Sequence, residues 1–107
     1  LFSQFVRGTG RLSLEAAVKK ITLDPATIWN LPGRGLLAPG NHADVVVFDA
    51  DTIGRGPEIA STDFPGDSIR WIRHQEGVDT VVVNGEITWS AEQGYVPGVR
   101  PGQIATR

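Results

Sequence analysis

The apolar positions of the first 31 residues recur with the period of a helix. They fall at i, i+3, i+4 and i+7 on one face, at Leu14, Ala17, Val18 and Ile21. Ser13 precedes this face as a plausible N-cap, and Asp24-Pro25 predicts a second N-cap with proline at the first helical position. Pro32-Gly33 ends the pattern. We therefore predict two packed helices within residues 1–31.

From Gly33 onward the pattern is that of strands and turns. Leu36-Leu37 predicts a short strand, and Pro39-Gly40 predicts a type II turn in which glycine supplies the positive φ. Residues 43–49 predict a longer strand. Its four consecutive apolar residues are typical of a strand covered on both faces in the interior of a sheet.

The second half of the chain contains one clear hairpin. Residues 79–83 and 86–89 flank Asn84-Gly85, and Asn-Gly between two apolar runs is the strongest local signal for a type I′ turn. Residues 50–68 are rich in glycine and proline and predict a long loop, followed by a short strand within residues 69–74. The Pro-Gly pairs at 97–98 and 101–102 predict an irregular tail.

Composition narrows the possible partners and location. The length of 107 residues fits one domain or part of one, and a net charge of -2 gives no electrostatic footprint for nucleic acid or an anionic membrane. No apolar run approaches the ~20 residues that cross a bilayer. Cysteine is absent, which excludes disulfides and thiolate metal sites and fits a reducing, cytoplasmic location. Because the chain does not begin with methionine, we expect it to be cut from something longer.

Candidate metal ligands are few. A zinc site needs three or four ligands at fixed geometry, and the two histidines, His42 and His74, are far apart in sequence. His42 and Asp44 supply two ligands at most. We interpret His42 as a loop histidine and His74 as a surface or interface residue.

Other motifs also favour structural roles. Gly35 and Gly40 have the spacing of a phosphate loop, but Asn41-His42 replaces the required lysine and hydroxyl residue. Asp49 and Asp51 follow a strand and are expected to cap a turn. None of the serines lies in a nucleophile elbow; they are Ser3, Ser13, Ser61, Ser68 and Ser90. The tryptophans, Trp29, Trp71 and Trp89, are expected in a core or an interface. We therefore assign no catalytic, cofactor-binding or metal-binding residue.

Several segments together resemble the C-terminal region of the amidohydrolase superfamily, closest to its N-acyl-D-amino-acid deacylase (D-aminoacylase-like) branch. The helical part of the resemblance lies in residues 12–22, similar to the last barrel helix, and in Asp24-Pro25-Ala26, similar to the short helix after it. The strand part lies in residues 34–40 and 43–49, similar to a "G-x-I-x-x-G-x-x-A-D" stretch with its following strand, and in the Val81–Gly85 "V-x-V-N-G" hairpin. Residues 97–102 resemble the closing "G-x-R-P-G" of the branch.

The resemblance implies a fold that is mainly β with N-terminal helices. Residues 1–32 would be the terminal helices of a (β/α)₈ barrel, and residues 33–107 would be the C-terminal part of a composite β-sandwich. The parent would be a metal-dependent hydrolase of C–N bonds, commonly with zinc, acting on a small N-acyl substrate through a metal-activated water. The family's metal-ligand motifs do not occur in these residues, so the segment by itself is expected to be structural, inactive and without a cofactor.

Two alternatives remain open. The chain could be a self-contained, non-catalytic β-rich interaction or oligomerisation module, or a complete small hydrolase. In the fragment reading the partner is the N-terminal part of the same protein, or a second copy that covers the exposed strands by self-association. No nucleic-acid or membrane partner is expected.

Overall fold

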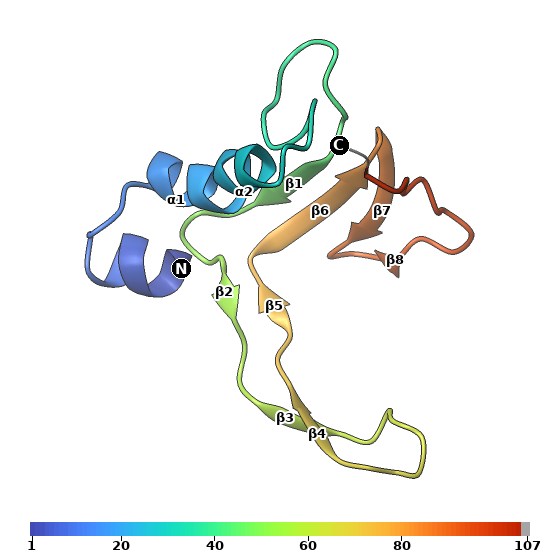
Figure 1. Cartoon of the computed structure of the whole chain (residues 1–107). Coiled ribbons are helices and arrows are strands. Elements are labelled where there is room, and N and C mark those ends of the chain that lie inside the picture. Colours follow the sequence, from blue (N-terminus) through green and yellow to red (C-terminus); the bar gives the residue numbers. More distant parts are fainter. Residues whose placement is uncertain (106–107) are drawn as a thin grey trace.

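The N-terminal helices lie to one side of a set of antiparallel strands (Figure 1). The computed structural model describes residues 1–105. The helical segments are a π-helix, η1 (Phe2–Gly8), and the α-helices α1 (Leu14–Ile21) and α2 (Leu23–Ile28). The strands are β1 (Val45–Phe48), β2 (Gly54–Arg55), β3 (Ile59–Ser61), β4 (Arg70–Ile72), β5 (Gln75–Glu76), β6 (Val78–Val83), β7 (Glu86–Ser90) and β8 (Gly94–Tyr95).

The first helix begins where the sequence predicts. The Ser13 hydroxyl accepts a hydrogen bond from the Ala16 amide at 3.2 Å, and Ala17, on the predicted apolar face, is fully buried. The predicted cap at Asp24 is wrong. Only Thr22 separates the two helices, so Asp24 falls within the first turn of α2, where its carboxylate forms an ion pair with Lys19.

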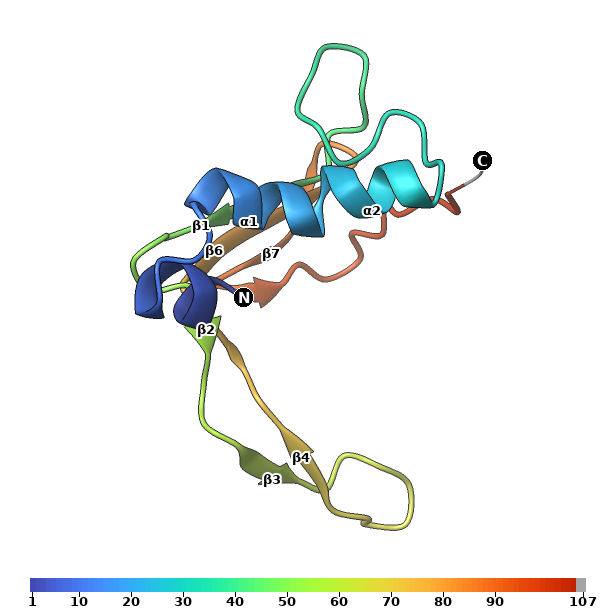
Figure 2. The same ribbon diagram turned by 60° about the vertical axis from the view of Figure 1, so that its left-hand side comes forward.

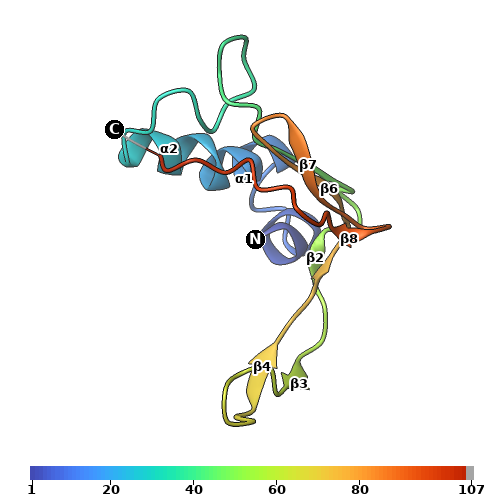
Figure 3. The same ribbon diagram turned by 90° about the vertical axis from the view of Figure 1, so that its right-hand side faces the viewer.

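The main sheet has the strand order β1-β6-β7-β8, and every neighbouring pair is antiparallel. The predicted hairpin is confirmed as β6 and β7. Asn84 and Gly85 have φ angles of 46° and 84°, and two consecutive positive φ angles are what a type I′ turn requires. Figure 3 views the sheet nearly edge-on and places α1 and α2 along one of its faces.

The prediction that residues 43–49 form an interior strand is wrong for the part of the chain that the structure describes. Strand β1 is shorter and lies at the edge of the sheet, paired with β6 alone. Val46 and Val47 point to opposite faces, and 51% and 47% of their surfaces are exposed. A run of four apolar residues therefore lacks a cover on either face.

The Leu36-Leu37 strand is also absent. The Asn41 side chain donates to the Leu36 carbonyl at 2.9 Å, and this contact folds the segment back on itself. The predicted turn at Pro39-Gly40 is confirmed, since the Asn41 amide donates to the Ala38 carbonyl at 3.1 Å and Gly40 has a φ of 87°. Local hydrogen bonds take the place of a strand partner here.

Residues 54–76 form a long two-stranded arm instead of the predicted loop. Strand β2 pairs with β5 and β3 pairs with β4, and the arm extends away from the main sheet (Figures 1 and 2). Near its tip Asp63 accepts two hydrogen bonds from Arg70, which lower the pKa of the Asp63 carboxyl well below its usual range. The guanidinium of Arg70 also lies 4.8 Å from the centre of the Phe64 ring. Strand pairing along the arm and the ion pair near its tip hold the arm together.

The chain exposes much more surface than a compact monomer. Its accessible surface is 8047 Å², whereas a folded monomer of this mass has about 5,800 Å². The radius of gyration is 16.1 Å, compared with ~13 Å for a compact domain of this length. Among residues 1–105 the buried apolar side chains are only Ala17 and Ala26. None of the helices in these residues has the length and apolar character that a membrane crossing requires.

Gly77 fixes the base of the arm, where β5 passes into β6. Its carbonyl accepts a hydrogen bond from the Asp49 amide at 2.8 Å, and its φ is 73°. A Cβ at this position would lie 2.4 Å from the Ile53 nitrogen, which is backbone and cannot turn aside. Only glycine fits both the dihedral angle and the space.

We predict that Gly77→Ala destabilises the chain far more than Gly94→Ala. Both glycines have positive φ, so each alanine meets roughly 1–2 kcal/mol of left-handed backbone strain. Gly94 has open space around it, whereas Gly77→Ala adds a backbone clash. Urea unfolding of the two variants measures the difference, and equal midpoints would contradict the close approach at Ile53.

Candidate functional site

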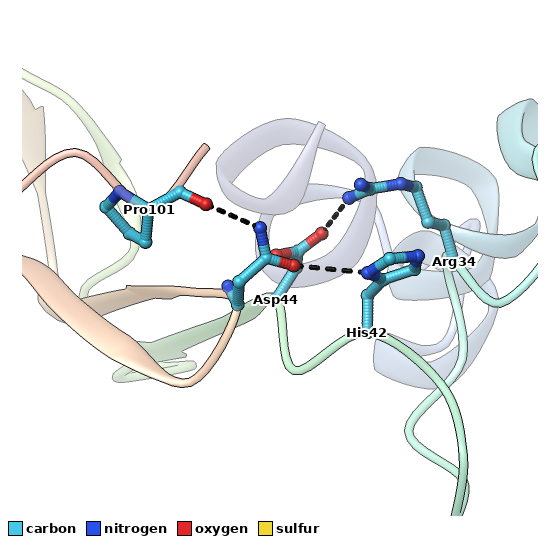
Figure 4. A network of polar contacts seen from close by, with 5 residues as sticks. Arg34, His42, Asp44 and Pro101 are labelled. Atoms are coloured by element: carbon cyan, nitrogen blue, oxygen red, sulfur yellow. Dashed lines mark hydrogen bonds and ion pairs between the residues drawn. The ribbon is translucent and has the colours of Figure 1, made fainter. Parts of the chain in front are cut away.

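A network of polar side chains joins four segments of the chain at the start of β1. It consists of Arg34, His42, Asp44, Asn84 and the carbonyl of Pro101, and we call it the Asp44–Asn84 network (Figure 4). The segments are the loop after α2, the residues before β1, the β6–β7 turn and the C-terminal tail. Among residues 1–105, no other set of side-chain hydrogen bonds connects as many residues, so we treat this network as the candidate site.

The carboxylate of Asp44 lies at the centre of these contacts. One oxygen accepts the backbone N–H of Asn84 at 2.9 Å, and the other forms an ion pair with Arg34. The Arg34 side chain is 20% exposed and that of Asp44 is 34% exposed, so water screens the pair only in part. The neighbouring Ala43 carbonyl accepts the Gly85 N–H at 2.9 Å. Residues 43 and 44 thus bind both amides of the β6–β7 turn.

The side chain of Asn84 connects this turn to the tail. Its Nδ2 donates to the Pro101 carbonyl at 2.7 Å, and its Oδ1 lies 3.1 Å from Nδ1 of His42. An amide oxygen only accepts hydrogen bonds, so the His42 ring carries a proton on Nδ1 in this arrangement. Both ends of the carboxamide are therefore held, and its orientation is defined.

The two histidines lie where the sequence predicts, one in a loop and one on the surface. His42 lies in the loop before β1, and its backbone amide donates to the Gly33 carbonyl at 2.9 Å. His74 is exposed between β4 and β5, and its carbonyl accepts the Gly56 amide at 2.8 Å. The fold does not bring the two rings into one site.

The predicted turn cap after β1 is also confirmed. The Asp51 amide donates to the Asp49 carboxylate at 2.8 Å, and this bond is the main reason that the pKa of Asp49 is lowered. Two of the tryptophans do not lie in a core: Trp29 and Trp71 are 62% and 69% exposed, and Trp89 is half-buried. Burial of the first two in an interface stays a prediction. Within residues 1–105 the buried apolar side chains are two alanines, so there is no core that could take up Trp29 or Trp71.

The residues present do not fit a metal centre. Among residues 1–105 no group of three or more His, Cys, Asp or Glu side chains is placed to hold a metal ion. The carboxylate of Asp44 already accepts a backbone amide on one oxygen and a guanidinium on the other. Neither oxygen is therefore left to bind a metal together with His42. The chemistry of the Asp44–Asn84 network is therefore that of a hydrogen-bonded joint between segments.

Two surface hollows add no catalytic group. One, of about 280 Å³, lies between residues 1–4 and 53–55, and the other, of about 260 Å³, lies against α2. Their linings contain neither a histidine nor a carboxylate, and such groups are the usual acids and bases of hydrolytic sites.

Comparison with known proteins identifies the family. The amidohydrolase family profile matches residues 3–89. An N-acyl-D-glutamate deacylase of Alcaligenes xylosoxydans xylosoxydans is 39% identical over the whole chain and 20% of its own length, and a D-aminoacylase of the same organism is 33% identical over the same shares. A dihydroorotase of Lactobacillus johnsonii is 31% identical over 83% of the chain and 21% of its own length. No solved structure matches the chain.

The chain belongs to the amidohydrolase family and is D-aminoacylase-like. This confirms the resemblance drawn from its sequence motifs. The chain spans about a fifth of the length of the curated relatives it matches. The observed structure, mostly β with two α-helices, is consistent with part of such a protein.

We predict that Asp44→Asn lowers the free energy of unfolding by about 1 kcal/mol. The substitution keeps the shape of the side chain but removes the charge, and hydrogen bonds to charged groups are stronger than neutral ones. Solvent exposure of the Arg34–Asp44 pair keeps the loss at the low end of the range. Asp51→Asn, an exposed carboxylate in the next loop, is the matched control. Equal urea midpoints for the two variants would contradict the conclusion that the contacts of Asp44 stabilise the fold.

Proposed function

We propose that the chain is the C-terminal part of a longer amidohydrolase that hydrolyses C–N bonds, with N-acyl-D-amino acids as the substrate class. The observation that carries this proposal is the similarity to an N-acyl-D-glutamate deacylase over the whole chain. The similarity to a dihydroorotase is lower, so it supports the reaction class more than a different substrate. The prediction of a cytoplasmic location stays a prediction.

Within that protein the role of residues 1–105 would be structural. The side chains of the Asp44–Asn84 network bind one another, and residues 1–105 do not fit a metal site. Any metal of the parent would accordingly be held by residues outside this segment. Residues 1–32 would close a (β/α)₈ barrel, and residues 33–107 would form part of a β-sandwich beside it.

The exposed apolar surface supports a role as part of something larger. Both faces of β1 are open at Val46 and Val47, and Ile28 and Trp29 at the end of α2 are 79% and 62% exposed. Large apolar side chains exposed in this number are unusual for a monomeric protein. We propose that the remainder of the same polypeptide covers the faces of the sheet and the end of α2.

We predict that hydrolysis requires the longer protein. The 107-residue chain should release no amino acid from N-acetyl-D-glutamate, whereas the protein that contains it should do so and should spare the L-enantiomer. Amine release measured with a fluorogenic reagent distinguishes the two. Turnover by the isolated chain, abolished by His42→Ala but not by His74→Ala, would instead favour a complete small hydrolase.

We also predict that the isolated chain self-associates. Burial of apolar surface stabilises association by about 25 cal/mol per Å², and the excess surface of this chain is large. Sedimentation should show an average mass that rises with concentration, and Val46→Lys should shift this rise to higher concentration. Glu86→Lys, a polar position on β7, serves as the control. A compact monomer at all concentrations would favour the self-contained module instead.

A further inference from the structure

Asn84 is the one asparagine of this chain that precedes a glycine. The chain has three asparagines, and the other two, Asn30 and Asn41, precede leucine and histidine. An asparagine is open to attack on its side-chain carbon by the backbone nitrogen of the next residue. Glycine leaves that nitrogen unhindered because it has no Cβ. Of the three asparagines, Asn84 is therefore the one most open to this attack.

The fold restrains both reactants of this step. The attacking nitrogen is that of Gly85, and its N–H is donated to the Ala43 carbonyl at 2.9 Å. The carbon under attack carries Nδ2 and Oδ1, which are held by the Pro101 carbonyl at 2.7 Å and by His42 at 3.1 Å. Ring closure needs the carboxamide to turn toward the Gly85 nitrogen, so it has to break these contacts first.

We propose that Asn84 is a deamidation site that the Asp44–Asn84 network keeps closed, and that opening of the network converts it irreversibly. In the open state the Gly85 nitrogen bonds to Cγ of Asn84 and gives up its proton. The Cγ–Nδ2 bond breaks, and Nδ2 leaves as ammonia with that proton. Water then adds to one of the two carbonyls of the cyclic imide, and the ring opens to an aspartyl or an isoaspartyl residue.

The product cannot restore the closed network. An ionised aspartate has no N–H to donate to the Pro101 carbonyl, and its charge lies beside the Asp44 carboxylate, whose oxygen is 2.9 Å from the residue's own amide. An isoaspartyl residue also lengthens the backbone within a two-residue turn and disturbs the register of β6 and β7. Once Asn84 has reacted, the hydrogen bond that joins the β6–β7 turn to the Pro101 carbonyl is therefore lost permanently.

The test follows Asn84 by peptide mapping of the intact protein during incubation at neutral pH, with mass spectrometry and separation of the isoaspartyl peptide. Deamidation in buffer should be slower than in concentrated urea. His42→Ala removes one contact, so it should speed the reaction in buffer by about twofold to tenfold, the factor by which loss of one neutral hydrogen bond raises the open population. In urea the variant and the unaltered protein should react equally.

His74→Ala, the other histidine of the chain, is the matched control and should leave the rate unchanged. Asp44→Asn is a second variant and should also speed the reaction in buffer, because it weakens the hold on the turn. Asn30 and Asn41 serve as internal references in every sample. Equal rates in buffer and urea, or a slower reaction in His42→Ala, would overturn the proposal, the second because His42 would then assist the attack.

Discussion

The contacts of the Asp44 carboxylate hold together the loop after α2, the start of β1 and the β6–β7 turn. A single side chain accepts the backbone amide of the β6–β7 turn and pairs with Arg34 in the loop after α2. With so few buried side chains, apolar packing within residues 1–105 contributes little to holding these segments together. Polar contacts at one corner of the sheet take over this task, and the tail joins the same corner through Asn84.

The contacts at the start of β1 are important because β1 is an edge strand of the main sheet. Among residues 1–105, strand β1 has one hydrogen-bonded neighbour, β6. The register of that pair runs from Val45 opposite Val82 to Phe48 opposite Val78, with an irregularity after Val47. At the far end of β1 the ring of Phe48 lies 5.3 Å from that of Phe2 in η1. The strand is thus anchored by charge and hydrogen bonds at its start and by aromatic contact at its end.

The elements defined by local chemistry could be predicted from the sequence. The Ser13 cap, the Pro39-Gly40 turn and the Asn84-Gly85 hairpin each depend on neighbouring residues, and each is confirmed. Within the arm, β4 confirms the short strand predicted within residues 69–74. The other strands of the arm and their pairing carry no periodic signal, because these strands are only two or three residues long. The Asp44–Asn84 network joins residues from 34 to 101. Arg34, Asp44, Asn84 and Pro101 all fall within the segments that resemble the family, and this shared occurrence was the available signal.

The two edges of the main sheet are unequal. Strand β8 is two residues long and is soon followed by Pro97-Gly98, so that edge offers almost no backbone for further pairing. The outer side of β1, in contrast, is an open row of donors and acceptors. Among residues 1–105 the sheet therefore offers a longer free edge at β1 than at β8. If two chains meet through β1, both of these edges are consumed and the outer strand on each side is β8, so this contact closes as a pair.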